Sequence, residues 1–138
     1  MKARSLRSML GLAVLLALTA SCGQSASSGN PPGAQSPCEK SSSIKGSIVT
    51  ISHTPSGSLI GSFLLDGTKE NQAEFDHVYV TARSTTHVFE KQQNECQTLP
   101  FTALKQGQRV QIQSTGIATQ SYPPQIEATE ILILSPKA

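Results

Sequence analysis

The sequence predicts an all-β fold, a small five-stranded barrel. Three observations indicate it: from Cys38 onward apolar residues recur about every second position, these segments are rich in Ile, Val and Thr, and turn residues separate them. A chain of 138 residues has room for one such domain. We therefore expect residues 38–138 to form a single β-barrel, with a small open sandwich as the alternative.

The first two strands are expected as a hairpin over residues 44–52 and 59–65. A Pro-Ser-Gly break at 55–57 separates them, and the turn dipeptide Asp66-Gly67 ends the second. Side chains alternate across a strand, so one face of the first strand collects every second residue. These residues are Ile44, Gly46, Ile48 and Thr50.

The third strand is expected over 77–82, with Val78 and Val80 on one face and His77, Tyr79 and Thr81 on the other. Residues 86–90 either extend this strand or form a short partner for it.

One helical turn is expected over 100–105, ended by Gly107, and it is followed by strands over 109–115 and 125–134. The alternating apolar residues of the last strand change from one face to the other near Glu130, which indicates a bulge or bend there. Five strands with a helical turn between the third and fourth is the order of an OB-like barrel.

Residues 1–21 have the pattern of a bacterial lipoprotein signal peptide. Three positive charges precede ten apolar residues, a helix of about 15 Å that is too short to span a hydrocarbon core of about 30 Å. The segment Ala20-Ser21-Cys22-Gly23 fits the lipid-attachment site, although Thr19 stands where Leu is commonest. We expect Cys22 to be acylated and to anchor the protein to membrane lipid in the cell envelope, outside the cytoplasm. Ordinary signal-peptidase cleavage nearby is the alternative.

The segment 22–37 is expected to be the lipidated cysteine followed by a flexible linker. Residues 23–37 carry no charge and no apolar side chain larger than Ala or Pro, so they cannot bury a core.

If Cys22 is acylated, Cys38 and Cys96 remain as a pair. Export places them in an oxidising compartment, where a structural disulfide is the expected state. Free thiols, or a catalytic or metal role, are the alternatives; there is no Cys-x-x-Cys, and no His lies within four residues of either Cys.

The charge pattern argues against a nucleic-acid partner. The formal charge of +2 depends on Lys2, Arg4 and Arg7, whereas residues 22–138 carry eight Lys and Arg against nine Asp and Glu. Six Phe and Tyr and no Trp leave few side chains on which bases could stack.

The sequence contains no catalytic motif, so we expect no enzyme activity, no catalytic residue, no cofactor and no metal site. Neighbours on a strand point to opposite faces, so Asp76 and His77 would not chelate one ion together; His77 and His87 would meet only if their strands paired. An acidic stretch around Gly67 fits no calcium-loop spacing, and a solvated turn is the expected state. Its members are Asp66, Glu70, Glu74 and Asp76.

The candidate ligand-binding residues are Tyr122 and His53. Tyr122 precedes Pro123-Pro124 in the loop before the last strand, and OB-folds use that loop for binding. An aromatic body with a polar tip on a proline-stiffened loop suits recognition, although we expect the ring to pack over the mouth of the barrel. His53, in the first hairpin loop, is expected on the same side.

The sequence also resembles a family of small lipid-anchored bacterial domains of the YobA type, DUF3221, over about residues 44–133. The resemblance rests on the order in which hydrophobic spacings and turn glycines follow one another along the chain, together with Ser-Tyr-Pro at 121–123. The matching segments are Ile44-Lys-Gly-Ser-Ile48, Leu65-Asp-Gly67, Asp76-His-Val-Tyr-Val80, Phe101-x-x-Leu104-x-x-Gly107-x-x-Val110-x-Ile112 and Ser121-Tyr-Pro-Pro-Gln125-x-x-Ala128-x-x-Ile131. It implies an OB-like barrel on an envelope lipoprotein and supplies no catalytic residue.

The sequence thus predicts a membrane-anchored envelope lipoprotein that is a non-catalytic binding module. Its loops 53–58 and 117–125 are expected to bind an envelope protein, a peptide or a small ligand. The alternatives are a structural or accessory component of an envelope complex and, less favoured, a secreted metal-binding or hydrolytic domain.

Overall fold

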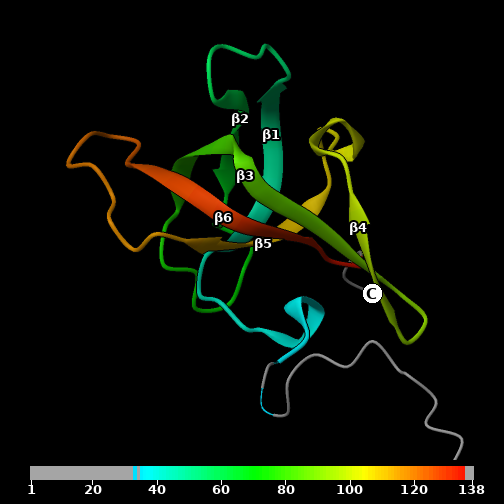
Figure 1. Cartoon of the computed structure of the whole chain (residues 1–138). Helices are drawn as coiled ribbons and strands as arrows, with labels where there is room; N and C mark the ends of the chain where they lie inside the picture. The colour runs from blue at the N-terminus through cyan, green and yellow to red at the C-terminus, as the bar shows by residue number, and fades with distance from the viewer. Residues whose placement is uncertain (1–32, 34, 136–138) are drawn as a thin grey trace, which may run out of the picture. The chain divides into compact units, whose positions relative to one another are not determined.

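The computed structural model describes residue 33 and residues 35–135. The predicted signal peptide, Cys22 and most of the predicted linker lie outside these residues. No helix among the described residues is long and apolar enough to cross a membrane. Six strands and two short 3₁₀ turns make up the fold (Figure 1). They are η1 (Pro37–Glu39), β1 (Lys45–Ser52), β2 (Leu59–Asp66), β3 (His77–Gln92), β4 (Glu95–Leu99), η2 (Phe101–Ala103), β5 (Arg109–Ser114) and β6 (Gln125–Ile133).

Five of the strands close into a barrel. The sheet order is β2-β1-β5-β6-β3-β4, and the additional pairing of β2 with β3 completes the ring β1-β2-β3-β6-β5. All of its pairings are antiparallel except that of β3 with β6, which is parallel. The prediction of a small OB-like barrel is confirmed, and its helical turn is the 3₁₀ turn η2.

A bulge in β1 corrects one predicted face. Ile48 pairs with Leu65 and Thr50 with Leu64, so Val49 is an extra residue between them. The inward and outward positions exchange after it: Thr50 is exposed, while Ile51 packs against the core. Ile48 faces inward as expected, but the expectation that Thr50 shares its face is wrong.

The irregularity expected near Glu130 is present. Gln113 pairs with Glu130 but Ser114 pairs with Ala128, which leaves Thr129 as the extra residue in β6. Ala128 and Ile131 can therefore both face the core although three positions separate them.

The third strand runs on further than the sequence indicated. Residues 86–90 extend it, and β3 continues past the barrel to Gln92. A two-residue turn at Gln93-Asn94 then leads into β4, which pairs only with β3 among the described strands. The sequence pattern did not indicate β4, because its five residues include few apolar side chains.

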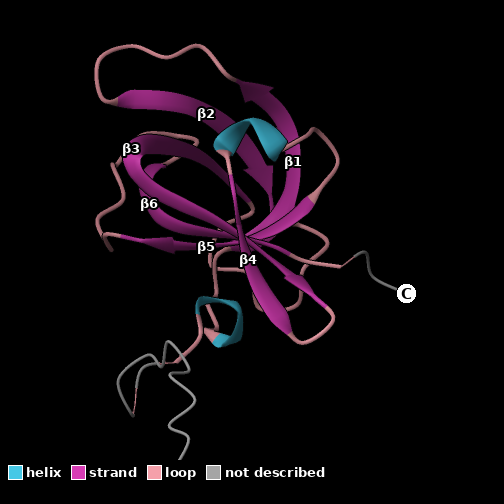
Figure 2. Cartoon of the chain, turned by 45° about the vertical axis from the view of Figure 1, so that its right-hand side comes forward, coloured by secondary structure: helices cyan, strands magenta, loops and turns pink. Residues whose placement is uncertain are grey.

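The core fills the inside of the barrel and one of its ends. Phe63, Val80 and Ile112 are no more than 1% exposed, and each comes from a different strand. Phe101 of η2 lies 6.5 Å from Phe63 between ring centroids, so η2 covers the barrel end beside β1 and β2 (Figure 2). The other buried apolar residues of this cluster are Ile44, Ile48, Leu65, Val78, Ala82, Val88, Leu104, Val110, Ile126, Ala128, Ile131 and Ile133.

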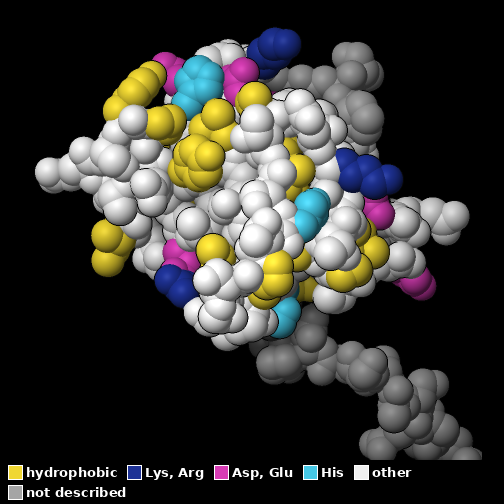
Figure 3. All heavy atoms as spheres, turned by 90° about the horizontal axis from the view of Figure 1, so that it is seen from above, with side chains coloured by type: hydrophobic (Ala, Val, Ile, Leu, Met, Phe, Trp, Pro, Cys, Tyr) yellow, Lys and Arg dark blue, Asp and Glu magenta, His cyan; other side chains and the backbone are white. Residues whose placement is uncertain are grey.

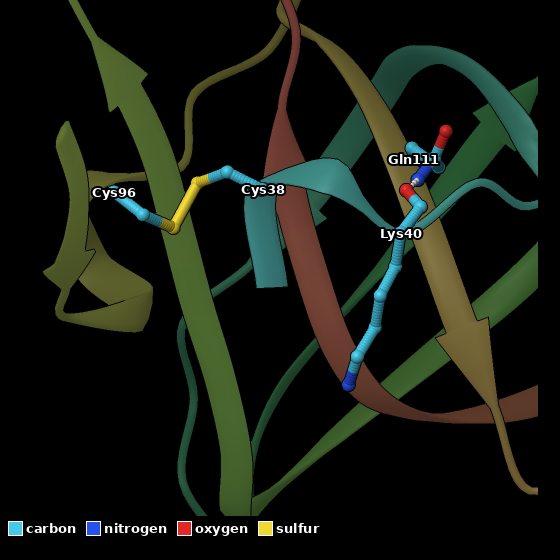
Figure 4. Close-up of a disulfide and its surroundings, with 4 residues drawn as sticks. All are labelled: Cys38, Lys40, Cys96 and Gln111. Carbon is cyan, nitrogen blue, oxygen red and sulfur yellow. Dashed lines mark hydrogen bonds between the residues drawn. A yellow bond between two sulfur atoms is a disulfide. The ribbon is translucent and has the colours of Figure 1, made fainter. Parts of the chain in front are cut away.

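The segment before β1 is bound to the outside of the barrel. The predicted disulfide is present: Cys38 of η1 is joined to Cys96 of β4 (Figure 4). The Gln111 side-chain amide donates to the Lys40 carbonyl at 2.6 Å, and the Lys40 ammonium pairs with Glu130 at 2.7 Å. Gln111 is 6% exposed although it is polar, because this segment covers it.

Candidate functional site

The two loops expected to form one binding surface lie at opposite ends of the barrel. The loop 53–58 follows the end of β1, where Ser52 pairs with Ser62. The β5–β6 loop, residues 115–124, leads to Gln125, which pairs with Tyr79 near the start of β3. Figure 1 shows the first loop at the top of the view and the second, in orange, at the left. The expectation that His53 and Tyr122 share one side is wrong, because β1 and β6 begin at the same end of the barrel.

Tyr122 points into solvent. Its side chain lies 87% exposed, so the expectation that the ring packs over the barrel mouth is wrong. A cis peptide bond joins it to Pro123. The candidate recognition residue is therefore accessible to a partner.

Hydrogen bonds within the β5–β6 loop fix its shape. The Thr119 N–H donates to the Gln125 carbonyl and the Gln125 N–H donates to the Thr119 hydroxyl, both at 3.0 Å. The Ser121 hydroxyl contacts the Thr119 hydroxyl at 2.7 Å and donates to the Pro123 carbonyl at 3.1 Å. The backbone that carries Tyr122 is thus held by the side chains of Thr119 and Ser121, which precede it, bound to backbone groups of Pro123 and Gln125, which follow it.

Two other large apolar side chains accompany this loop, and neither was predicted as a site residue from the sequence. Ile117 is 80% exposed within the loop, and Tyr79, 40% exposed, lies at its base, where its N–H donates to the Pro124 carbonyl at 2.8 Å. Its position in the sequence could have indicated that Ile117 is exposed. An aliphatic residue directly after Gly116 has no strand neighbours to cover it.

The charges at this end of the barrel are mainly acidic. The loop 115–124 itself contains no charged residue, whereas the neighbouring β2–β3 loop carries the exposed carboxylates Glu74 and Asp76. Glu74 accepts a hydrogen bond from the Ser43 hydroxyl at 2.7 Å. An apolar, uncharged loop beside carboxylates is therefore the surface that this end presents.

His53 lies at the other end and contacts η2. Its ring meets Phe101 edge-on with 5.3 Å between ring centroids. Figure 3 shows this end of the molecule: hydrophobic side chains form small separate groups among uncharged atoms, and the charged side chains lie toward the edges of the view. His53 thus has a packing contact with η2.

Among the remaining histidines and acidic residues, His77 Nε2 lies 3.9 Å from Asp66 Oδ1 across the pairing of β2 with β3. His77 and His87 lie on the same strand, so they do not face each other across a pair of strands. Asp66 accepts hydrogen bonds from Thr68, and Glu70 from Arg109. In residues 33 and 35–135, no group of three or more His, Cys, Asp or Glu side chains is arranged to hold a metal ion.

A cleft of about 720 Å³ lies where the ends of β3 and β6 meet the start of β5 and the β2–β3 loop. Arg109 forms one wall, and its guanidinium donates to both carboxylate oxygens of Glu70, at 2.5 and 3.0 Å. These hydrogen bonds raise the pKa of Arg109 above its ordinary value, because the Glu70 carboxylate stabilises the charged guanidinium. The sequence pattern did not indicate this cleft, because its lining residues come from five separate segments.

Comparison with known proteins identifies no relative. No protein family matches the sequence, and neither a curated protein nor a solved structure is significantly similar to the chain. The resemblance to the DUF3221 family therefore stays a prediction.

Proposed function

We propose that this chain is a membrane-anchored lipoprotein of the cell envelope whose barrel binds another protein through the β5–β6 loop. The observation that carries the proposal is the pair Ile117 and Tyr122, 80% and 87% exposed on a loop fixed by its own hydrogen bonds. Large exposed apolar side chains on an ordered loop are typical of recognition surfaces, because little conformational entropy is lost on binding. The lipid anchor at Cys22 rests on the sequence pattern.

The partner is a protein with an uncharged pocket that has basic residues at its rim. The apolar loop supplies two protruding side chains for such a pocket, and aromatic anchors often dominate binding energy. Glu74 and Asp76 beside it are complementary to a basic rim. The same carboxylates disfavour an anionic membrane as the occupant, since membrane-binding surfaces use Lys and Arg.

Site-specific cross-linking in the native host tests this surface. A photoreactive residue is placed at position 122 and, as the control, at position 53 on the opposite end. We expect one discrete protein adduct from position 122 and none from position 53. The reverse pattern, or no adduct from position 122, would overturn the assignment of the loop.

Binding to the purified partner then gives the contribution of each side chain. Tyr122→Ser and Ile117→Ser should each weaken the affinity about tenfold or more, as central interface residues do. The matched control is Val49→Ser, an apolar residue 37% exposed at the β1 bulge. Equal effects from all three variants would contradict a surface centred on the loop.

A separate measurement tests the anchor. The intact mass of the protein purified from its host's membranes should begin at Cys22 with added acyl chains and lack the two hydrogens of the Cys38–Cys96 bond. A product cleaved elsewhere and without acyl chains would mean a secreted domain, and the anchor would be wrong while the loop could still bind.

A structural role in an envelope complex has one observation in its favour. Among the strands that the structure describes, β4 pairs only with β3, so its other edge has backbone groups available for another strand. In that case the loop variants would leave assembly unchanged, and Thr98→Pro on β4 would abolish it, because proline removes a backbone donor.

A further inference from the structure

The cleft bounded by Arg109 gathers positive charge in a domain that is acidic overall. Four of the seven Lys and Arg residues in the described part of the chain line it, against two of the nine acidic residues. The four cations are Lys69, Lys91, Lys105 and Arg109, and the two acids are Glu70 and Glu90. Since the described residues carry more acids than bases, this local excess of two positive charges is not a consequence of overall composition.

Three of the four cations can be assigned from their contacts: Arg109 is committed to the cleft wall, whereas Lys91 and Lys105 are available to a ligand. Arg109 donates to Glu70 and, at 3.3 Å, to the Ser135 carbonyl, so it holds the cleft wall together. The side chains of Lys91 and Lys105 are exposed and make no hydrogen bond or ion pair with any described residue. Two ammonium groups on separate segments of one cleft can therefore approach a ligand that enters it.

The cleft also has an apolar side. Ile133 at the end of β6 and Leu134 after it are among its lining residues. Buried Ile133 belongs to the barrel core, so this wall is as rigid as the barrel. A ligand with an apolar part attached to an anionic group matches both sides of the cleft.

We propose that this cleft binds an organic phosphate, with the phosphate between the ammonium groups of Lys91 and Lys105 and the apolar part against Leu134. The excess of two positive charges matches the dianionic charge of a phosphate monoester. Lysine binds phosphate as a point charge, whereas a carboxylate ligand would be expected to use a bidentate Arg, and Arg109 already makes that contact with Glu70. The site is separate from the β5–β6 loop and does not depend on the protein partner.

Titration of the full chain with phenyl phosphate at constant ionic strength, followed by NMR, tests the proposal. Amide shifts should be confined to residues 90–91, 105–109 and 133–135. The double variant Lys91→Gln/Lys105→Gln should weaken binding about tenfold or more, because two ion pairs are lost. The control Lys45→Gln removes the same type of charge from β1 outside the cleft and should leave the affinity unchanged.

Vesicles distinguish a lipid headgroup from a free phosphate as the natural source. Phosphatidylglycerol vesicles are compared with phosphatidylcholine vesicles for the parent and both variants, which share the same N-terminal segment. A preference for phosphatidylglycerol that only the double variant loses supports the site with a lipid source, and phenyl phosphate binding alone supports it with a soluble one. No saturable binding of either ligand, or equal losses from Lys45→Gln, would overturn the proposal.

Discussion

Arg109 joins three segments of the barrel through one guanidinium group. It lies at the start of β5, binds both oxygens of Glu70 in the β2–β3 loop and reaches the carbonyl of Ser135 after β6. The Glu70 side chain is 6% exposed. We expect Arg109→Gln to lower the free energy of unfolding by about 2 kcal/mol, since it removes charge-assisted hydrogen bonds from a mostly buried carboxylate.

Urea unfolding measures this loss, and an exposed ion pair provides the control. Arg83 and Glu127 are 45% and 37% exposed in their side chains, so Arg83→Gln should cost less than about 1 kcal/mol. Similar losses from the two variants would show that burial does not strengthen the Arg109 pair.

The pKa of the Asp66 carboxyl group depends on the hydrogen bonds that it accepts from Thr68. Its pKa lies below the ordinary value of 3.8, first because the Thr68 hydroxyl donates to it at 2.6 Å and then because the Thr68 N–H donates at 2.9 Å. Because the folded-state pKa is the lower one, this carboxylate stabilises the fold above pH 3.8, and that contribution is lost as the pH falls through the folded pKa.

We expect Thr68→Val to raise the pKa of Asp66 toward 3.8, as measured by NMR titration of its carboxyl group. The substitution removes the hydroxyl donor and keeps the backbone donor, so part of the depression should remain. Thr102→Val in η2 should not change this titration. An Asp66 pKa that is the same in both variants would contradict the assigned cause.

At the scale of elements, η2 depends on a glycine in β2. A Cβ atom added at Gly61 would collide with the Phe101 ring and with the Ser52 carbonyl oxygen. The close approach lets Phe101 of η2 cover the barrel end, and the sequence alone indicates neither partner. Gly61→Ala should therefore lower the free energy of unfolding by about 2 kcal/mol, because the backbone must move.

Thermal unfolding compared with Ser62→Ala checks this cost. Ser62 is the next residue and points to the other face of β2, so its substitution should change stability by less than about 0.5 kcal/mol. A Gly61→Ala variant as stable as Ser62→Ala would mean that η2 can shift without loss.

The strands also show where the alternation of apolar residues predicts the buried face of a strand and where it does not. Alternation in β3 is regular, and Val78 and Val80 face the core as predicted. In β1 the extra residue Val49 reverses the alternation, and the residues on either side do not indicate a bulge. β4 contains few apolar residues and forms a strand because it pairs with β3. Its own residue pattern therefore did not predict a strand.

At the scale of the whole molecule, the disulfide fastens the segment before β1 to a hairpin outside the closed barrel. Cys38 and Cys96 are separated by 58 positions, so reduction releases a long loop. The chain-entropy relation gives about 4 kcal/mol for a loop of this length. We expect Cys38→Ser/Cys96→Ser to lose stability of this order and to keep the barrel, because none of the barrel's strand pairings involves η1.

Urea unfolding and amide hydrogen exchange together check this expectation. The amides of β1, β2, β5 and β6 should remain protected in the double variant, while those near residues 37–43 exchange faster. Loss of protection throughout β5 and β6 would show that the barrel needs the disulfide to form.

The sequence by itself determined the class of fold, most strand positions and the pairing of Cys38 with Cys96, because each depends on local alternation, turn residues or cysteine count. Only the tertiary structure decided which loops share an end, that Tyr122 projects into solvent and that four cations meet at one cleft. These properties depend on the order in which strands pair around the barrel. Closure brings together residues distant in the sequence, such as Glu70 and Arg109, and separates loops such as 53–58 and 115–124 that a linear reading places together.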